Sequence, residues 1–208
     1  MTPTSQSSQE IRDVLPDAPA RILVAEDEAL VAQGVVASLE GLGLEVIGPC
    51  RDGVEAIETC RAQKPDLALM DIRMPNMDGL EAAKVLFAEM EIPVVILSAF
   101  GDDDYLRDSG EAGVFGYLLK PVKTDQLRAG LTVAWQRYLD HMEQRSRIIT
   151  LEQRLEDRKL IEKAKWIIVD RKGVSEPDAM RLLQQQSRST RKTITQVAQG
   201  VIDSNALL

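Results

Sequence analysis

Five short apolar runs alternate with amphipathic stretches between Arg21 and Leu118, and this alternation constrains the fold more than any other feature of the chain. The runs are RILVA (21–25), LEVIG (44–48), DLALM (66–70), PVVILS (93–98) and VFGYL (114–118). Four of them are almost continuously apolar, as strands of a parallel sheet are when helices cover both faces. The pattern predicts an α/β domain with a doubly wound, five-stranded parallel sheet in the order 2-1-3-4-5.

After Thr124 the strand pattern stops, and a stripe of residues follows at intervals of mostly three or four. The stripe consists of Leu127, Leu131, Ala134, Tyr138, His141, Arg145, Ile148 and Leu155. It is an imperfect heptad pattern, and neither Pro nor Gly interrupts the chain between Leu131 and Ile168. We therefore expect one long helix that extends beyond the α/β domain and packs its second half against a partner helix or a second domain.

The C-terminal residues predict a small all-α domain of three helices, the first of which is the end of the long helix. The motif Ser175-Glu-Pro-Asp is typical of a helix start, and apolar spacing carries that helix to about Ser187. The polar stretch SRSTRK (187–192) is interpreted as a connection. Thr193 is then expected to cap a last helix over 194–203.

Charge is distributed unevenly over the chain, whose formal net charge is −8. Residues 1–144 carry 12 Lys and Arg against 25 Asp and Glu, whereas residues 145–208 carry 13 against 8. An acidic part joined to a basic part suggests two domains, the second able to bind a polyanion. A charged helical tail with solvated faces would give the same balance.

Several classes of protein are excluded by composition. No apolar run approaches the roughly 20 residues that cross a bilayer. The first twenty residues are rich in Ser, Gln and Pro and are interpreted as a mobile tail instead of a signal peptide. Cys50 and Cys60 have no metal-type spacing and are too few for a disulfide scaffold, so we expect a reducing, cytoplasmic location.

Acidic residues follow two of the predicted strands. Glu26 and Asp27 come after the first strand and Asp71 after the third, and these strands are neighbours in the predicted order. Oxygen ligands that converge in this way favour Mg²⁺, although acids at helix N-termini are also common for structural reasons. Ser98 and Lys120 end the fourth and fifth strands, and together the five side chains are typical of a phosphoryl-transfer site with an aspartate nucleophile.

With these residues the chain resembles the receiver domain of two-component response regulators. The matching segments are ILVAEDE (22–28), LALMDIRMPNMDGLEA (67–82), VVILSAF (94–100) and AGVFGYLLKPV (112–122). The resemblance implies that a sensor histidine kinase phosphorylates Asp71. It also implies that Mg²⁺ is bound by Asp27, by Asp71 and by the backbone carbonyl of Arg73.

The same resemblance gives roles to four further residues. Glu26 would act on the metal through water, where Asp is commoner in the family. Ser98 and Lys120 would hold the phosphoryl oxygens, and Lys120-Pro121 is a candidate cis peptide. Tyr117 falls at the aromatic switch position of the family, where a packed strand-end aromatic is the alternative interpretation.

The basic C-terminal part is the expected effector. A DNA-reading helix-turn-helix is disfavoured because the last helix (194–203) has no Lys or Arg. The positive charge lies instead on Arg154, Arg158, Lys159, Lys163, Lys165, Arg188, Arg191 and Lys192. This distribution suits folded RNA, and a solvated coiled-coil flank explains part of it equally well.

The segment from Leu155 to Ile202 resembles the ANTAR domain, the RNA-binding antitermination module of AmiR- and NasR-type regulators. The residues at its recurrent positions are Arg158, Ile161, Ala164, Lys165, Ile167, Ser175, Ala179, Leu182, Leu183 and Ala198. Ser187-Arg188 departs from the usual Ala-Met. Trp166 replaces a usual Gly, and core filling is favoured for it over stacking on an RNA base.

We therefore expect a cytoplasmic response regulator, not an enzyme, that dimerises on phosphorylation and binds RNA stem-loops to cause transcription antitermination. The expected parts are a flexible tail (1–20), a receiver domain (21–125), a coiled-coil-like linker (126–155) and an ANTAR domain (156–208). The expected RNA contacts are Arg158, Lys159, Lys165, Arg191 and Lys192. The alternative is a phosphorylation-dependent protein adaptor that dimerises through the long helix without binding RNA.

Overall fold

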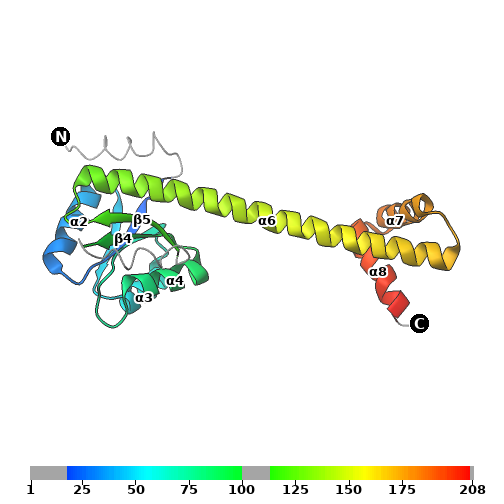
Figure 1. The fold of residues 1–208 in the computed structure, drawn as a ribbon, viewed down its shortest axis with the longest axis horizontal. Helices are drawn as coiled ribbons and strands as arrows, with labels where there is room; N and C mark the ends of the chain where they lie inside the picture. Colours follow the sequence, from blue (N-terminus) through cyan, green and yellow to red (C-terminus); the bar gives the residue numbers. More distant parts are fainter. Residues whose placement is uncertain (1–17, 100–112, 207–208) are drawn as a thin grey trace. The chain divides into compact units, whose positions relative to one another are not determined.

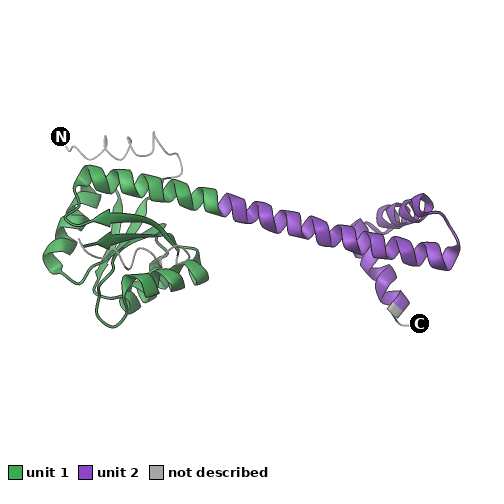
Figure 2. Ribbon diagram, viewed as in Figure 1, with its two compact units in different colours: residues 1–141 green, residues 142–208 purple. Residues whose placement is uncertain are grey.

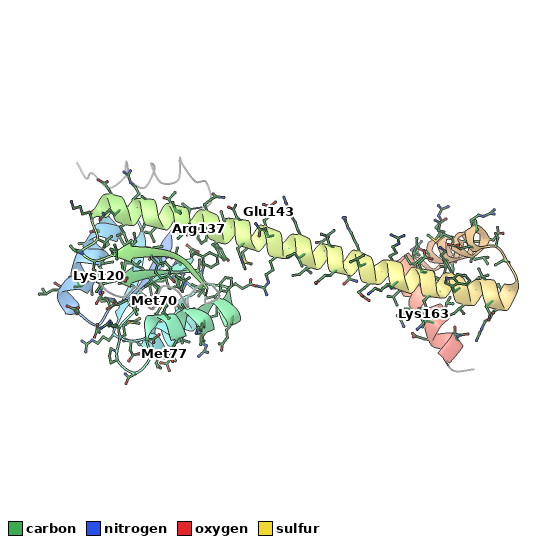
Figure 3. All side chains as sticks on the ribbon, in the orientation of Figure 1. Met70, Met77, Lys120, Arg137, Glu143 and Lys163 are labelled. Carbon is green, nitrogen blue, oxygen red and sulfur yellow. The ribbon has the colours of Figure 1, made fainter. Side chains whose placement is uncertain are left out.

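The structure, a computed structural model, describes residues 18–99 and 113–206 (Figure 1). The chain divides into two compact units, unit 1 (residues 1–141) and unit 2 (residues 142–208), as Figure 2 shows. The boundary falls within one helix, α6 (Thr124–Lys172), between the labelled residues Arg137 and Glu143 (Figure 3). The expected long helix is therefore confirmed.

Unit 1 contains a five-stranded parallel sheet in the order β2-β1-β3-β4-β5, which confirms the predicted order. The strands are β1 (Arg21–Ala25), β2 (Glu45–Cys50), β3 (Leu67–Asp71), β4 (Val94–Ser98) and β5 (Val114–Leu119). Every residue of β3 and β4 is buried, as expected for central strands that helices cover on both faces.

Helices pack against both faces of the sheet. One core joins the sheet to α3 (Gly53–Gln63) and α4 (Gly79–Met90), and the other joins it to α2 (Ala29–Gly41) and the start of α6. Leu127, Leu131 and Ala134 of α6 are buried in this second core. The receiver core thus extends past the expected boundary at residue 125, because the first turns of the long helix cover one face of the sheet.

Unit 2 consists of the end of α6, α7 (Glu176–Thr190) and α8 (Ile194–Ala206). Its buried core residues are Ala164, Ile168, Ala179, Leu183, Val197 and Ala198. Ser175 caps α7 as expected, because its hydroxyl accepts a hydrogen bond from the backbone N–H of Asp178. Helix α7 continues through Ser187–Thr190, which were expected in a connection, because neither Gly nor Pro interrupts these residues and the backbone turns left-handed only at Arg191, with φ 56°.

The apolar residues of α6 lie in three different environments along the helix. Up to Ala134, those of the stripe are buried in unit 1, and the His141 ring lies edge-on to Phe87 and Phe115 at centroid distances of 5.5 and 5.7 Å. Further along, more than half of the surface of Ile148, Ile149, Leu151 and Leu155 is exposed. Beyond these, Ala164 and Ile168 are buried in the core of unit 2.

Trp166 does not fill the core of unit 2. Its side chain is 69% exposed, so the interpretation as a core residue is wrong. The residue lies on α6 two positions from the buried Ala164 and Ile168, and on a helix such a position turns away from the buried face.

Among the described residues, no helix is long and apolar enough to cross a membrane.

Candidate functional site

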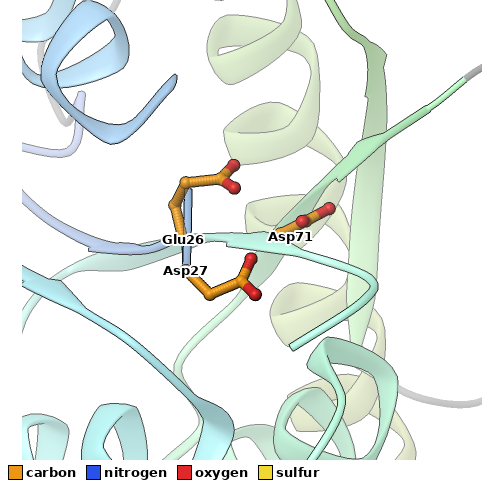
Figure 4. A group of neighbouring side chains, drawn as sticks. All are labelled: Glu26, Asp27 and Asp71. Atoms are coloured by element: carbon orange, nitrogen blue, oxygen red, sulfur yellow. The ribbon is translucent and has the colours of Figure 1, made fainter. Parts of the chain in front are cut away.

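The three predicted acids meet at the carboxyl edge of the sheet. Glu26 and Asp27 follow β1, Asp71 ends β3, and these parallel strands are direct neighbours. Figure 4 shows the three carboxyl groups gathered at this edge. One ligand oxygen from each lies within 4.8 Å of the others. Glu26 and Asp71 are buried and Asp27 is exposed, so the cluster is open to solvent on one side.

Lys120 supplies a positive charge to the cluster. Its Nζ lies 2.6 Å from Glu26 Oε2 and 2.9 Å from Asp71 Oδ2. Burial raises the pKa of Glu26, the hydrogen bond from Lys120 opposes the rise, and the charge of Asp71 adds to it. Burial alone would lower the pKa of Lys120, but hydrogen bonds to Glu26 and Asp71 outweigh this effect and raise it.

The remaining predicted receiver residues lie around the same edge. Ser98 ends β4 and is buried, and its backbone carbonyl accepts a hydrogen bond from the N–H of Lys120 at 2.8 Å. Tyr117 lies on β5 and is 37% exposed, so it is neither fully packed nor fully free. The Lys120-Pro121 peptide is cis, as expected, and Arg73 is exposed two residues after Asp71.

Gly79 is a site residue that the sequence reasoning did not single out. A Cβ atom at this position would lie 2.0 Å from the backbone oxygen of Asp71, so no side chain can be accommodated. The N–H of Gly79 donates to the carbonyl of Ile72 at 2.9 Å, and Asp78 caps α4 by accepting from Glu81 N at 2.7 Å. The sequence does contain an indication of this role, because the Asp78-Gly79 pair lies in the segment LALMDIRMPNMDGLEA (67–82) that matches the receiver family.

The donor set fits a hard divalent cation. All three groups are carboxylates, which are the ligands that Mg²⁺ prefers, and the exposed side at Asp27 leaves room for the waters that this ion retains. A single lysine ammonium offsets only part of the repulsion among three carboxylates. The site can therefore concentrate positive charge around the carboxylate of Asp71.

Of the five residues predicted to contact RNA, four are exposed and the fifth, Lys165, is buried. Arg158, Arg191 and Lys192 are exposed. Lys159 is exposed but lies 2.6 Å from a carboxylate oxygen of Glu156.

Lys165 belongs to the interior of unit 2. Its side chain is only 10% exposed and makes ion pairs with Glu162, at 3.0 Å, and with Glu176 of α7. Hydrogen bonds to Glu176 and then Glu162 raise its pKa. This geometry favours a structural role for Lys165, so its contact with RNA remains only a prediction.

Comparisons with known families agree with both resemblances. The response regulator receiver domain family matches residues 22–132, and the ANTAR domain family matches residues 150–202. The transcriptional regulatory protein PdtaR of Mycobacterium tuberculosis (strain ATCC 25618 / H37Rv) is 36% identical over 186 residues, which are 89% of this chain and 91% of that protein. The transcriptional regulatory protein LiaR of Bacillus subtilis is 37% identical over 116 residues, which are 55% of each protein.

Solved structures support the fold of unit 1. The signal receiver domain of a modulated diguanylate cyclase from Desulfovibrio desulfuricans G20 has 32% identity and a TM-score of 0.54, over 60% of this chain and 99% of that one. The signal receiver domain of the putative response regulator NarL from Mycobacterium tuberculosis has 32% identity and a TM-score of 0.51, over 54% of this chain and 92% of that one.

Proposed function

The chain belongs to the response regulators that combine a receiver domain with an ANTAR domain, and from this premise we propose that phosphorylation of Asp71 controls the binding of unit 2 to RNA stem-loops and thereby causes transcription antitermination. The observation that supports the first step is the ion pair of Lys120 with Asp71 and Glu26 inside the acidic cluster. The proposed role is regulatory, without turnover of an outside substrate.

The reaction at Asp71 is a phosphoryl transfer. A carboxylate oxygen of Asp71 attacks the phosphorus of a phosphohistidine on a sensor kinase, a P–O bond forms as the P–N bond breaks, and the imidazole leaves with a proton. Mg²⁺ would be held by Asp27, Asp71 and the backbone carbonyl of Arg73, with Glu26 acting through water. When bound, it supplies positive charge to the phosphoryl oxygens.

The chain's own polar groups hold the product. The ammonium of Lys120 is already within 3 Å of Asp71 and is positioned to bind a phosphoryl oxygen. Ser98 Oγ donates to the carbonyl of Ala99 at 3.1 Å, so it must turn to donate to the phosphoryl group instead. That movement, together with a rotation of the partly exposed Tyr117, would bias the unit towards a second conformation.

Phosphate incorporation tests this assignment. Incubation with acetyl phosphate and Mg²⁺ should add one acid-stable, base-labile phosphoryl group per chain. The variant Asp71→Asn should incorporate none, whereas Asp125→Asn, which changes an exposed aspartate at the start of α6, should behave as the wild type. Incorporation at the wild-type level by Asp71→Asn would show that the acceptor is another residue.

The RNA-binding step rests on different observations. The ANTAR match covers residues 150–202, and exposed cations such as Arg158, Arg191 and Lys192 lie within it. RNAs that co-purify with the phosphorylated protein should be stem-loops, and their binding should weaken steeply with salt as counterions are released. A protein that dimerises on phosphorylation but retains no RNA would instead support the adaptor alternative.

A further inference from the structure

Unit 2 contains a cavity of about 480 Å³ where α6, α7 and α8 meet. Part of its lining is apolar and comes from all three helices, through Ile167, Leu182 and Val201. These three side chains are only partly buried, so an apolar surface remains uncovered within the unit. The volume lies in the range of sites that enclose small ligands or single groups of larger ones.

Among the described residues, the charged side chains that line this cavity are all positive. They are Arg171, Lys172 and Lys192, and no described Asp or Glu lines it. Within the described parts of the chain, none of these three cations makes an ion pair, whereas Lys159 and Lys165 of the same unit are neutralised by glutamates. The cavity is therefore a place where positive charge is uncompensated, and an anionic partner would compensate it.

Neutral hydrogen-bonding groups complete the lining. Gln196 Oε1 accepts from Thr193 N at 3.0 Å, which leaves its amide N–H groups available as donors. The side-chain amide of Gln186 has no hydrogen-bond partner among the described residues. Thus an apolar face, uncompensated cations and amide groups surround one space.

We propose that this cavity binds an unstacked base of an RNA loop, with the phosphates next to that base on Arg171, Lys172 and Lys192. The inference rests on the proposed RNA-binding function and assigns it a site. Proteins bind single-stranded loops in this way: apolar side chains pack against the face of a base, amides hydrogen-bond to its edge, and Lys and Arg contact the backbone phosphates. Unit 2 of a second copy is a poorer occupant, because residues 145–208 carry 13 Lys and Arg against 8 Asp and Glu and would add positive charge next to these three cations.

Gly200 provides a test that changes neither charge nor fold. It lines the cavity from α8, and a Cβ atom there would meet nothing within 4 Å, so Gly200→Leu should fill the cavity without a clash. Leu is also a better helix former than Gly, so the variant should fold at least as stably as the wild type. Gly34→Leu in α2 is the matched control, because a Cβ at Gly34 likewise meets nothing within 4 Å.

A second pair of variants tests the charge. Lys192→Gln removes a cation from the cavity rim, and Lys84→Gln removes an exposed cation of α4 in unit 1 that does not line the cavity. The probes are a pool of RNA hairpins that share one stem and carry a randomised loop, and the same stem as a loopless duplex. The protein is the full chain, with and without beryllofluoride and Mg²⁺.

The proposal predicts that the wild type prefers the hairpins to the duplex. Gly200→Leu should weaken hairpin binding by about 5- to 150-fold, the range for losing one base contact, and Lys192→Gln should also weaken it. Both control variants should bind as the wild type does. Wild-type affinity in Gly200→Leu and Lys192→Gln would overturn the cavity assignment and leave RNA binding standing.

Two other outcomes would also overturn it. If the wild type binds neither probe in either state, the proposed function fails together with the inference. If Gly200→Leu changes the oligomeric mass in sedimentation at unchanged hairpin affinity, the cavity accommodates a second copy of the chain.

Discussion

Gly79 shapes the carboxyl edge of the sheet, where Glu26, Asp27 and Asp71 meet, because it has no side chain. The start of α4 touches the backbone of Asp71, with 2.0 Å between the Asp71 oxygen and the place that a Cβ would take. Any larger residue must push either α4 or the end of β3 away. Such a displacement acts directly on the residue proposed to accept phosphate.

We predict that Gly79→Ala lowers the free energy of unfolding by about 1–3 kcal/mol, as overpacked sites do, and slows phosphate incorporation by acetyl phosphate. Urea unfolding measures the first effect and the incorporation rate the second. Gly34→Ala, in an open helical position, should instead stabilise the chain slightly. Normal stability in Gly79→Ala would show that α4 adjusts freely.

Cys60 is fully buried, and burial raises the pKa of its thiol to about 12, from an ordinary value of 9.0. The folded chain keeps this thiol protonated where the unfolded chain loses its proton. The free energy of unfolding should therefore fall as pH rises from about 9 towards 12. Cys60→Ala should have a shallower fall in urea titrations over this range, and an unchanged slope would refute the assignment.

At the scale of elements, the sequence predicts the order of the strands and the polar residues at their ends. A buried parallel strand has an almost continuously apolar sequence, and the strand order then shows which strand ends are neighbours. The sequence is not sufficient for α6. An apolar stripe at intervals of three and four shows which side of a helix is buried but not by what. Leu131 is covered by the helix's own sheet, whereas Leu151 is exposed.

The same limit explains Lys165 and Trp166. The ion pair of Lys165 depends on Glu176, the first residue of α7. The sequence predicts that this helix starts after Ser175, but no local pattern shows that its first turn lies next to Lys165 in space. Core filling is the interpretation that the sequence favours for Trp166, but the core of unit 2 is filled from the face of α6 that carries Ala164 and Ile168.

We predict that Arg158 and Lys165 respond differently to neutralisation. Arg158→Gln should reduce the slope of log affinity against log salt by about 1 for RNA hairpins, because an exposed phosphate contact is lost. Lys165→Gln should mainly lower the thermal stability of the chain, because Glu162 and Glu176 lose their shared partner. A reduced salt slope in Lys165→Gln, with an unchanged slope in Arg158→Gln, would instead indicate that Lys165 contacts RNA.

The exposed part of α6 is the proposed dimer contact. Ile148, Leu151 and Leu155 follow one another at intervals of three and four and are all more than half exposed, as in a short heptad seam. We predict that Leu151→Lys weakens dimerisation of the beryllofluoride-treated chain in sedimentation experiments. Ile149→Lys, which changes an equally exposed residue off the seam, should not, and equal effects of the two would exclude the seam.

For the whole molecule, we predict that occupancy at Asp71 shifts the dimer dissociation constant by about 5- to 150-fold, the range of typical coupling energies. The physical reason is that a ligand moves an equilibrium only by its different affinity for the two states, and the exposed seam is too short for a permanent coiled coil. Sedimentation with and without beryllofluoride measures the shift. Identical mass distributions over a wide range of concentrations, with unchanged RNA affinity, would refute the coupling.

Helix α6 supplies side chains to the cores of both units, and the helical repeat decides which face of α6 each of these side chains lies on. Each residue advances an α-helix by about 100°. Deleting seven exposed residues after His141 would therefore turn the remaining helix by only about 20°, whereas deleting five would turn it by about 140°. Natural or engineered changes of length in this stretch should be tolerated in steps of seven or eleven residues, because such steps keep the apolar residues before and after the change on nearly the same face of α6.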